Sequence, residues 1–93
     1  MTYHIKFTNA YKKSYKRAKK RGLNLKLLDD VVEALGQGYK LDAKYRDHAL
    51  HGNWEGFREC HIQPDWLLIY LVENDVLTLT LVETGTHADI FDE

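Results

Sequence analysis

The N-terminal residues alternate between apolar and polar side chains. Tyr3, Ile5 and Phe7 are separated by polar residues, and this period of two predicts a strand with one buried face. The next residue, Thr8, or its neighbour Asn9 can cap a helix, because a short polar side chain can accept hydrogen bonds from the first backbone N–H groups. The chain therefore begins as a strand that leads directly into a helix.

Two helices are expected next, because apolar positions now recur every three or four residues. The first ends at Gly22, a residue typical of helix C-termini, and Asn24 can cap the second. Their apolar positions are Tyr11, Tyr15 and Ala18 in the first helix and Leu25, Leu28, Val32 and Leu35 in the second. Two helices with so short a connection are typical of a helical hairpin.

Residues 39–52 show neither period, so we expect a loop there with at most a short turn of helix. Strands are predicted after it at residues 53–62, 66–72 and 76–84. The stretch 66–72, "WLLIYLV", is apolar throughout, which is typical of a central strand covered on both faces. The sequence "ENDV" at 73–76 indicates a tight hairpin between the last two strands.

The expected order is strand, helix, helix and three strands, which is an α+β fold in a single domain over residues 1–93. We expect a small, twisted, mainly antiparallel sheet with the helical hairpin packed on one face. The other face, or part of it, is then open and can carry a site. The N-terminus has no apolar segment of the signal-peptide type and no run long enough for a membrane span, so we expect a cytoplasmic protein without a membrane partner.

Charge is distributed unevenly along the chain. Residues 1–28 contain nine lysines and arginines and no acidic residue, whereas the rest contains four basic residues and all fourteen acidic ones. Such a block is typical of a surface that binds a polyanion, either RNA or an acidic partner protein. The residues that we assign to this basic patch, as a candidate contact with RNA, are Lys12, Lys13, Lys16, Arg17, Lys19 and Lys20.

Three histidines lie next to the ends of predicted strands, where distant segments can converge: His48, His61 and His87. Asp65 follows four residues after His61, across a turn that contains Pro64. No pair has the close spacing of a zinc motif, so we expect no metal. The single cysteine, Cys60, excludes an internal disulfide and is expected to be a buried filler.

Acid and base cleavage of RNA requires only such residues and no cofactor. One group removes the proton of a ribose 2′-OH, another protonates the departing 5′ oxygen, and histidine titrates in the right range for both transfers. Asp65 could orient a histidine, and the aromatic rings of Trp66 and Phe91 could stack on an unpaired base. The residues therefore permit a ribonuclease site.

Strand alternation separates the candidates of the segment 58–61 between two faces. If Cys60 faces the core, then Glu59 and His61 face the open side, and Arg58 shares the face of Cys60. Cys60 and His61 then cannot form a nucleophile pair. For Arg58 two interpretations stay open: an ion pair at the sheet edge, or a contact with a substrate phosphate.

Two segments carry a resemblance to a known family. Residues 47–70, "DHALHGNWEGFRECHIQPDWLLIY", and residues 84–91, "TGTHADIF", resemble the RelE-like toxins of bacterial toxin–antitoxin pairs, specifically the YafQ branch. The resemblance extends over essentially the whole chain. It implies a ribosome-dependent mRNA endonuclease that uses no metal or cofactor, leaves 2′,3′-cyclic phosphate and 5′-OH ends, and is held inactive by a partner antitoxin.

The resemblance also implies roles for individual residues. Four positions that match the motifs are implied to be catalytic: His87, His61, Asp65 and His48. His87 would donate the proton to the leaving oxygen, whereas the identity of the base stays open between His48 and His61. Phe91 would position the substrate and Glu59 would support the site. Trp66 belongs to the motif, but a role as a packing anchor is the stronger interpretation.

One departure from the branch concerns charge. Glu83 stands before "TGTH", where arginine is common, and an anion near the scissile phosphate should weaken transition-state stabilisation. Ala49 in "DHAL", where the branch often has proline, is a milder change. An alternative function therefore stays open: a degenerate, non-catalytic toxin fold that acts by binding, either as a co-repressor with its antitoxin or like the ParE-type relatives.

Overall fold

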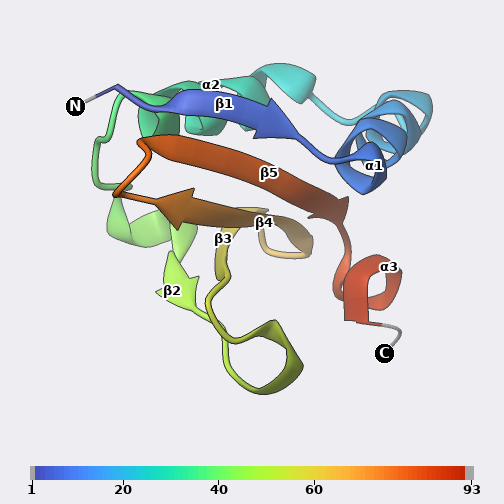
Figure 1. The fold of residues 1–93 in the computed structure, drawn as a ribbon. Helices are drawn as coiled ribbons and strands as arrows, with labels where there is room; N and C mark the ends of the chain where they lie inside the picture. The colour runs from blue at the N-terminus through green and yellow to red at the C-terminus, as the bar shows by residue number, and fades with distance from the viewer. Residues whose placement is uncertain (1, 92–93) are drawn as a thin grey trace.

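The computed structural model describes residues 2–91. Its strands form one five-stranded sheet in the order β1-β5-β4-β3-β2 (Figure 1). The strands are β1 (His4–Phe7), β2 (His48–Ala49), β3 (Arg58–Gln63), β4 (Trp66–Glu73) and β5 (Thr78–Gly85). Strand β1 pairs with β5 in parallel, and the other neighbours pair antiparallel. The predicted α+β class and the mainly antiparallel sheet are confirmed.

Two long helices, α1 (Asn9–Lys20) and α2 (Leu25–Gly36), pack together on one face of the sheet (Figure 1). Thr8 caps α1 by accepting a hydrogen bond from the N–H of Tyr11, and Asn24 caps α2 in the same way. A short third helix, α3 (His87–Phe91), follows β5. None of the helices formed by residues 2–91 combines the length and the apolar character that a membrane crossing requires.

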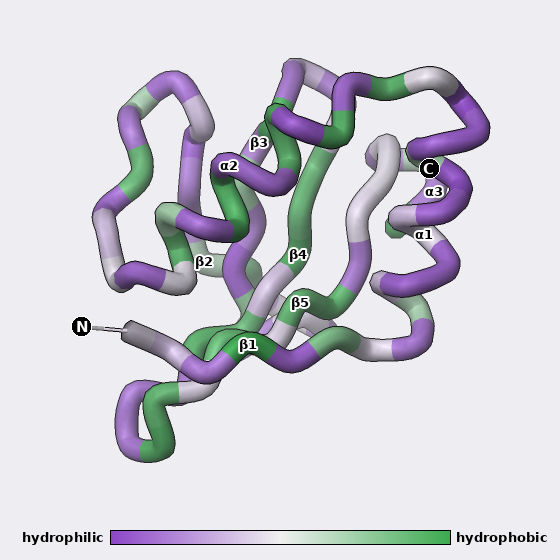
Figure 2. Tube along the Cα trace, turned by 90° about the horizontal axis from the view of Figure 1, so that it is seen from above, coloured by the Kyte–Doolittle hydropathy of each residue, from purple (hydrophilic) through white to green (hydrophobic). Residues whose placement is uncertain are grey.

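The core lies between the helical pair and the sheet. Its buried residues include Tyr11, Leu28, Val31, Leu68, Tyr70, Leu79 and Leu81. Along β4 the side chains of Leu68 and Tyr70 face the helices, while those of Leu67 and Ile69 face the opposite side, and all are buried. The central, apolar character of β4 is visible in Figure 2 and confirms the expectation from its sequence.

The segment between α2 and β3 differs from the prediction. The expected short turn of helix is η1 (Ala43–Tyr45), but the segment also contains a second 3₁₀ turn, η2 (Gly52–Trp54), and the strand β2, neither of which was predicted. The strand predicted at 53–62 was placed too early, because β3 begins only at Arg58. A two-residue strand is too short to produce a periodic pattern, and for that reason the sequence does not reveal it.

Phe7 was also predicted to be buried, and this was wrong, since its side chain is 53% exposed. The strand β1 lies at the edge of the sheet, and Phe7 lines an open groove between β1, α1 and α2 together with Tyr11 and Val32. Helical cover is therefore incomplete at this edge.

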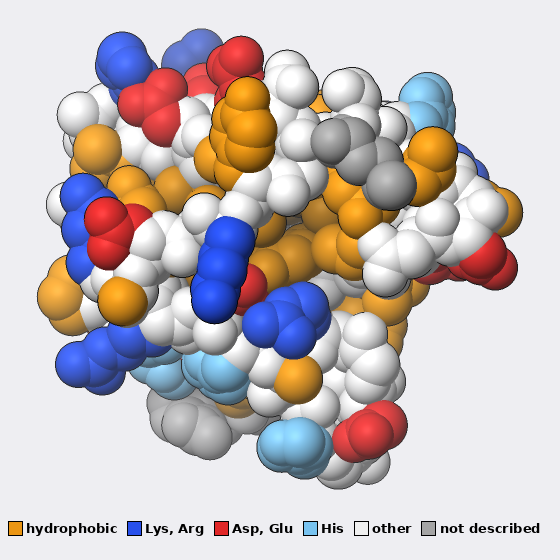
Figure 3. All heavy atoms as spheres, turned by 90° about the vertical axis from the view of Figure 1, so that its left-hand side faces the viewer, with side chains coloured by type: hydrophobic (Ala, Val, Ile, Leu, Met, Phe, Trp, Pro, Cys, Tyr) orange, Lys and Arg blue, Asp and Glu red, His pale blue; other side chains and the backbone are white. Residues whose placement is uncertain are grey.

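Charge is mixed on the side of the molecule at the left of Figure 1. There acidic and basic side chains are interspersed, and some of them border an apolar hollow (Figure 3). The excess of basic charge noted in the sequence belongs instead to α1, where Lys12, Lys13, Lys16, Lys19 and Lys20 are exposed.

Candidate active site

Strand pairing places polar side chains on the sheet face opposite the helices. Residues that pair directly across neighbouring strands share a face. His48 pairs with Glu59, which in turn pairs with Ile69, and His61 pairs with Leu67. Because Ile69 and Leu67 face away from the helices, His48, Glu59 and His61 do so too. The orientation predicted from strand alternation for Glu59 and His61 is confirmed.

The three candidate histidines come together at one end of this face. The ring centroids of His48 and His61 are 6.2 Å apart, and those of His61 and His87 are 5.9 Å apart. Strands β2 and β3 and the start of α3 supply one ring each, so segments far apart in the sequence meet here. A single phosphodiester group can bridge rings at this spacing.

Glu59 holds two of these rings. Its buried carboxylate accepts a hydrogen bond from His61 Nε2 at 3.0 Å and lies 3.6 Å from His48 Nε2. The other ring nitrogens contact backbone carbonyls: His48 Nδ1 lies 2.7 Å from the oxygen of Arg46, and His61 Nδ1 lies 3.3 Å from that of Pro64. A carbonyl can only accept, so Nδ1 is the donor in both rings.

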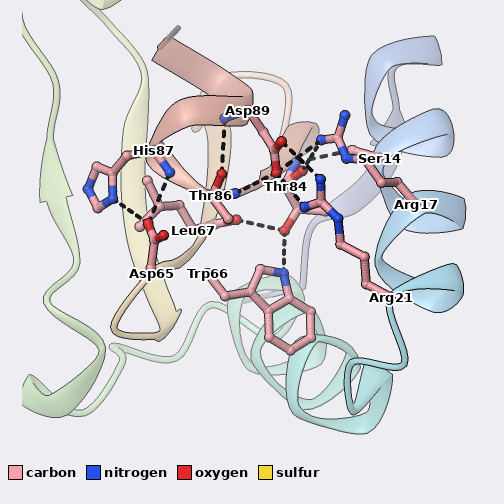
Figure 4. A network of polar contacts seen from close by, with 10 residues as sticks. All are labelled: Ser14, Arg17, Arg21, Asp65, Trp66, Leu67, Thr84, Thr86, His87 and Asp89. Carbon is pink, nitrogen blue, oxygen red and sulfur yellow. Dashed lines mark hydrogen bonds and ion pairs between the residues drawn. The ribbon is translucent and has the colours of Figure 1, made fainter. Parts of the chain in front are cut away.

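Asp65 orients the third ring. One carboxylate oxygen of Asp65 accepts hydrogen bonds from both the ring nitrogen Nδ1 of His87, at 2.7 Å, and its backbone N–H, at 3.1 Å (Figure 4). These bonds lower the pKa of Asp65, so the carboxyl group stays ionised. An ionised partner favours the protonated imidazole of His87 and fixes Nε2 as the atom that can transfer a proton.

The same atoms could also hold a cation. Ligand atoms of Glu59, His61 and His87 all lie within 4.8 Å of one another, and a carboxylate with two imidazoles is a donor set that suits zinc or a similar ion. Cys60 contributes nothing, since it is fully buried on the opposite face, and burial raises the pKa of its thiol to about 12. Its interpretation as a packing residue is confirmed.

Arg58 lies away from the histidines. Its guanidinium group forms an ion pair with Asp47, with Nη2 at 3.3 Å from Oδ2, at the edge formed by β2 and β3. The hydroxyl of Tyr70 donates a second hydrogen bond to the carboxylate of Asp47. Of the two interpretations left open for Arg58, the structure supports the ion pair at the sheet edge.

Trp66 is a packing residue. Its side chain is only 3% exposed, and its indole N–H donates to Thr84 Oγ1 at 3.0 Å (Figure 4). The hydroxyl of Thr84 then donates to the carbonyl of Leu67, and the N–H of Thr84 donates to Ser14 of α1. A ring buried in this way cannot stack on a base. Its hydrogen bond instead fastens the turn that precedes β4 to Thr84 in β5, and Thr84 in turn binds α1.

Phe91 lies at the margin of the site, with its ring 6.4 Å from that of His87. Two half-buried aromatic residues that the sequence analysis did not select continue this surface. Trp54 packs edge-on against Phe91 at 5.5 Å and against Phe57 at 5.6 Å. The motif "WEGF" offered a signal, because it carries two large rings in a short irregular segment beside a strand.

Glu83 lies on the sheet face that carries the site. It pairs with Ile69, whereas the preceding pair of this ladder joins Tyr70 to Leu81, so Val82 is an extra residue in a β-bulge. The bulge moves Glu83 from the core side, which strict alternation after Leu81 would require, to the side of Glu59. Burial raises the pKa of Glu83, and the positive charge of Arg17 opposes that rise.

The residues of the basic patch differ in their contacts. Its five lysines are exposed on α1, but Arg17 donates a hydrogen bond to the carbonyl of Thr84 at 3.2 Å and lies 3.8 Å from Asp89. Arg21, which we did not assign to the patch, binds Asp89 directly (Figure 4). Asp89 was not predicted either, although the spacing of Thr86 and Asp89 matches a helix-capping motif.

An α+β sheet with a helical pair on one face, and with imidazoles and carboxylates gathered on the other, defines the class of small RelE-like toxins. The chain belongs to the YafQ family within this class, since the family described as "Bacterial toxin of type II toxin-antitoxin system, YafQ" matches residues 3–92.

Individual relatives agree with this assignment. The mRNA interferase toxin YafQ of Escherichia coli K12 is 38% identical over 88 residues, which cover 94% of each chain. The toxin in the crystal structure of the E. coli DinJ–YafQ toxin–antitoxin complex has a TM-score of 0.90 at 36% identity, with 98% of this chain and 99% of that chain covered. A metal-bound toxin from Helicobacter pylori has a TM-score of 0.89 at 41% identity, with 98% and 100% covered.

Proposed function

We propose that this chain cleaves mRNA inside the translating ribosome by general acid and base catalysis without a metal ion. The general activity follows from the family: the chain is the toxin of a type II toxin–antitoxin system and an mRNA interferase, which is an endoribonuclease. The meeting of three imidazoles and two carboxylates on one sheet face carries the finer proposal, because these groups suffice for proton transfer at a phosphodiester.

In the proposed reaction the ribose 2′ oxygen attacks phosphorus and the bond from phosphorus to the 5′ oxygen breaks. A base takes the proton of the 2′-OH, and His87, held by Asp65, gives its proton to the departing 5′ oxygen. The products are a 2′,3′-cyclic phosphate and a 5′-OH end. Phe91 lies beside His87, where its ring can position a neighbouring base.

His48 suits the role of base better than His61 does. Since Nδ1 of His48 donates to the carbonyl of Arg46, the neutral ring has its unprotonated nitrogen at Nε2. In His61 both ring nitrogens face acceptors, Nδ1 the carbonyl of Pro64 and Nε2 the carboxylate of Glu59, so neither is available to take the proton of the 2′-OH. We therefore assign proton abstraction to His48. His61 would hold the phosphate, and Glu59 would hold the ring of His48 in place.

A partner antitoxin is part of any type II system, and the E. coli toxin in the solved complex is bound to DinJ. We propose an antitoxin that is acidic where it meets α1, since five exposed lysines cover that helix. The same lysines would contact ribosomal RNA once the antitoxin is lost. Because the ribosome and its mRNA are cytoplasmic, we expect the activity in the cytoplasm. A single domain over residues 1–93 would carry it.

The test is in vitro translation of a defined mRNA with purified toxin, free of antitoxin, and mapping of the breaks. We expect cleavage by the wild-type chain and at least a 100-fold slower reaction for His87→Ala. His51→Ala is the matched control, because His51 is exposed outside the cluster and pairs only weakly with Glu55 at 3.7 Å. An intact message with the wild-type chain, or equal losses in both variants, would contradict the proposal.

The non-catalytic alternative rests on Glu83, which adds a negative charge to the face that would hold the phosphate. Growth arrest after induction in cells separates the two functions. If chemistry causes the arrest, then His87→Ala abolishes it; if binding causes it, then His87→Ala leaves it largely intact.

A further inference from the structure

We infer that Asp89 and Arg21 are positioning residues for His87, because they fasten the helix that carries His87 to the long helix α1. The inference rests on the proposed function, in which His87 is the proton donor. Arg21 and Asp89 bind each other, and Asp89 also binds Thr86 at the start of α3, so their effect would be exerted through the placement of α3.

The helix α3 requires an external support. It has only five residues, His87–Phe91, and a helix of this length is not stable by itself in water. His87 is its first residue, so any tilt or fraying of α3 moves the ring directly. The sheet and α1 must therefore supply the rigidity that a proton donor needs.

Asp89 supports α3 through both of its carboxylate oxygens. Oδ2 accepts from Arg21 Nη1 at 2.7 Å and Oδ1 accepts from Arg21 Nη2 at 3.2 Å, which is a bidentate ion pair (Figure 4). Arg17 adds a second positive charge 3.8 Å away. The hydrogen bond from Arg21 holds the pKa of Asp89 well below its usual range, so the carboxylate is charged at all physiological pH values.

The same carboxylate closes the start of the helix. Oδ2 accepts from the N–H of Thr86 at 2.9 Å, and the N–H of Asp89 donates to the hydroxyl of Thr86 at 3.0 Å, which is a reciprocal capping arrangement. The next N–H, that of His87, donates to Asp65. Two successive backbone groups are thus fixed by two different carboxylates, one linked to α1 and one in the turn before β4.

Gly85 gives an independent indication that this close approach is built into the chain. A Cβ atom at position 85 would lie 2.9 Å from Arg17 Nη2 and 2.9 Å from Asp89 Oδ2, and the residue has a φ of +156°. Only a residue without a side chain lets β5 pass so closely beside the ion pair. The arginines at the end of α1 therefore serve the placement of α3 and are not simply part of a surface for RNA.

The test compares Arg21→Ala and Asp89→Asn with the wild-type chain in single-turnover cleavage on programmed ribosomes. These substitutions change the net charge in opposite directions, so a shared loss cannot come from altered attraction to RNA. We expect both to lower the cleavage rate at saturation by roughly 10- to 100-fold, with ribosome affinity within threefold of wild type. We also expect the alkaline limb of the pH–rate profile to move to lower pH, because a displaced ring loses the stabilising contact of its protonated form with Asp65.

The matched controls are Lys26→Ala and Asp30→Asn, which break an exposed ion pair of 2.9 Å within α2 and should change neither rate nor profile. Arg21→Lys, which keeps the charge but not the bidentate pair, should recover part of the rate, and circular dichroism would show whether each variant is folded. Rates and profiles like those of the controls, or a loss that appears only in ribosome affinity, would overturn the inference. An inactive wild-type chain would instead overturn the proposed function.

Discussion

Glu83 shows how one residue and one bulge change the electrostatics of the site. Its carboxylate faces the side of the sheet that carries Glu59 and His61, where negative charge on the phosphate increases in the transition state. We predict that Glu83→Gln raises the rate of mRNA cleavage about tenfold and that Glu83→Arg raises it further. The measurement is single-turnover cleavage at saturating toxin, and an unchanged or lower rate in both variants would contradict the prediction.

Glu83 also predicts a pH dependence of stability. Burial raises the pKa of Glu83 in the folded chain above its ordinary value of 4.5, so the folded state binds the proton more tightly than the unfolded state. The resulting contribution to stability is fully present below pH 4.5 and is lost as the pH rises through the raised value. We therefore expect Glu83→Gln to raise the melting temperature at pH 7, and to raise it less at pH 4. An equal change at both pH values would show that packing, and not ionisation, is responsible.

At the level of residues, the sequence identified the polar groups better than their surroundings. His48, His61 and Asp65 all border strand ends, and strand ends converge in a small sheet, so their meeting with His87 could be anticipated. The face on which Glu83 lies could not be anticipated, because the extra residue of a β-bulge leaves no recognisable pattern in the sequence.

The elements of the chain were predicted where the sequence shows a repeating pattern of apolar positions. The helices α1 and α2 and the strands β4 and β5 are long enough to show their periods. The elements β2 and α3 have two and five residues and show none, although each carries one of the three histidines. The site is thus built partly on elements that only tertiary contacts stabilise.

The strand β2 offers a test of that dependence. Asp47, just before it, accepts hydrogen bonds from the buried hydroxyl of Tyr70 and from Arg58, and these bonds hold the segment that carries His48. We predict that Tyr70→Phe lowers the free energy of unfolding by about 1 to 3 kcal/mol, because a hydrogen bond to a charged group is lost at a part-buried site. We also expect slower cleavage, since His48 would be less well placed.

Denaturant unfolding gives the free energy, with Tyr15→Phe as the matched control. The hydroxyl of Tyr15 also donates to a carboxylate, that of Asp29, but this contact is exposed. Removing it should change stability by less than about 0.5 kcal/mol. Equal effects of the two substitutions would mean that β2 does not depend on Tyr70.

For the whole molecule, the structure separates two uses of basic residues on one helix. Lys12, Lys13 and Lys16 are exposed, whereas Arg17 is engaged with Thr84 and Asp89. The charge block in the sequence does not distinguish them, because the difference depends on contacts with β5 and α3, far along the chain. A binding experiment should therefore change the lysines and leave the arginine in place.

We predict that changing Lys12, Lys13 and Lys16 together to Ala flattens the dependence of the logarithm of ribosome affinity on the logarithm of salt concentration by roughly 2 units. Each lysine that neutralises an RNA phosphate releases counterions, so losing three contacts reduces the slope. The control removes the same number of charges elsewhere, at the exposed residues Lys26, Lys40 and Lys44. Equal flattening in both triple variants would mean that the ribosome responds to net charge and not to the exposed face of α1. An unchanged slope after the changes at Lys12, Lys13 and Lys16 would show that this face does not take part in ribosome binding.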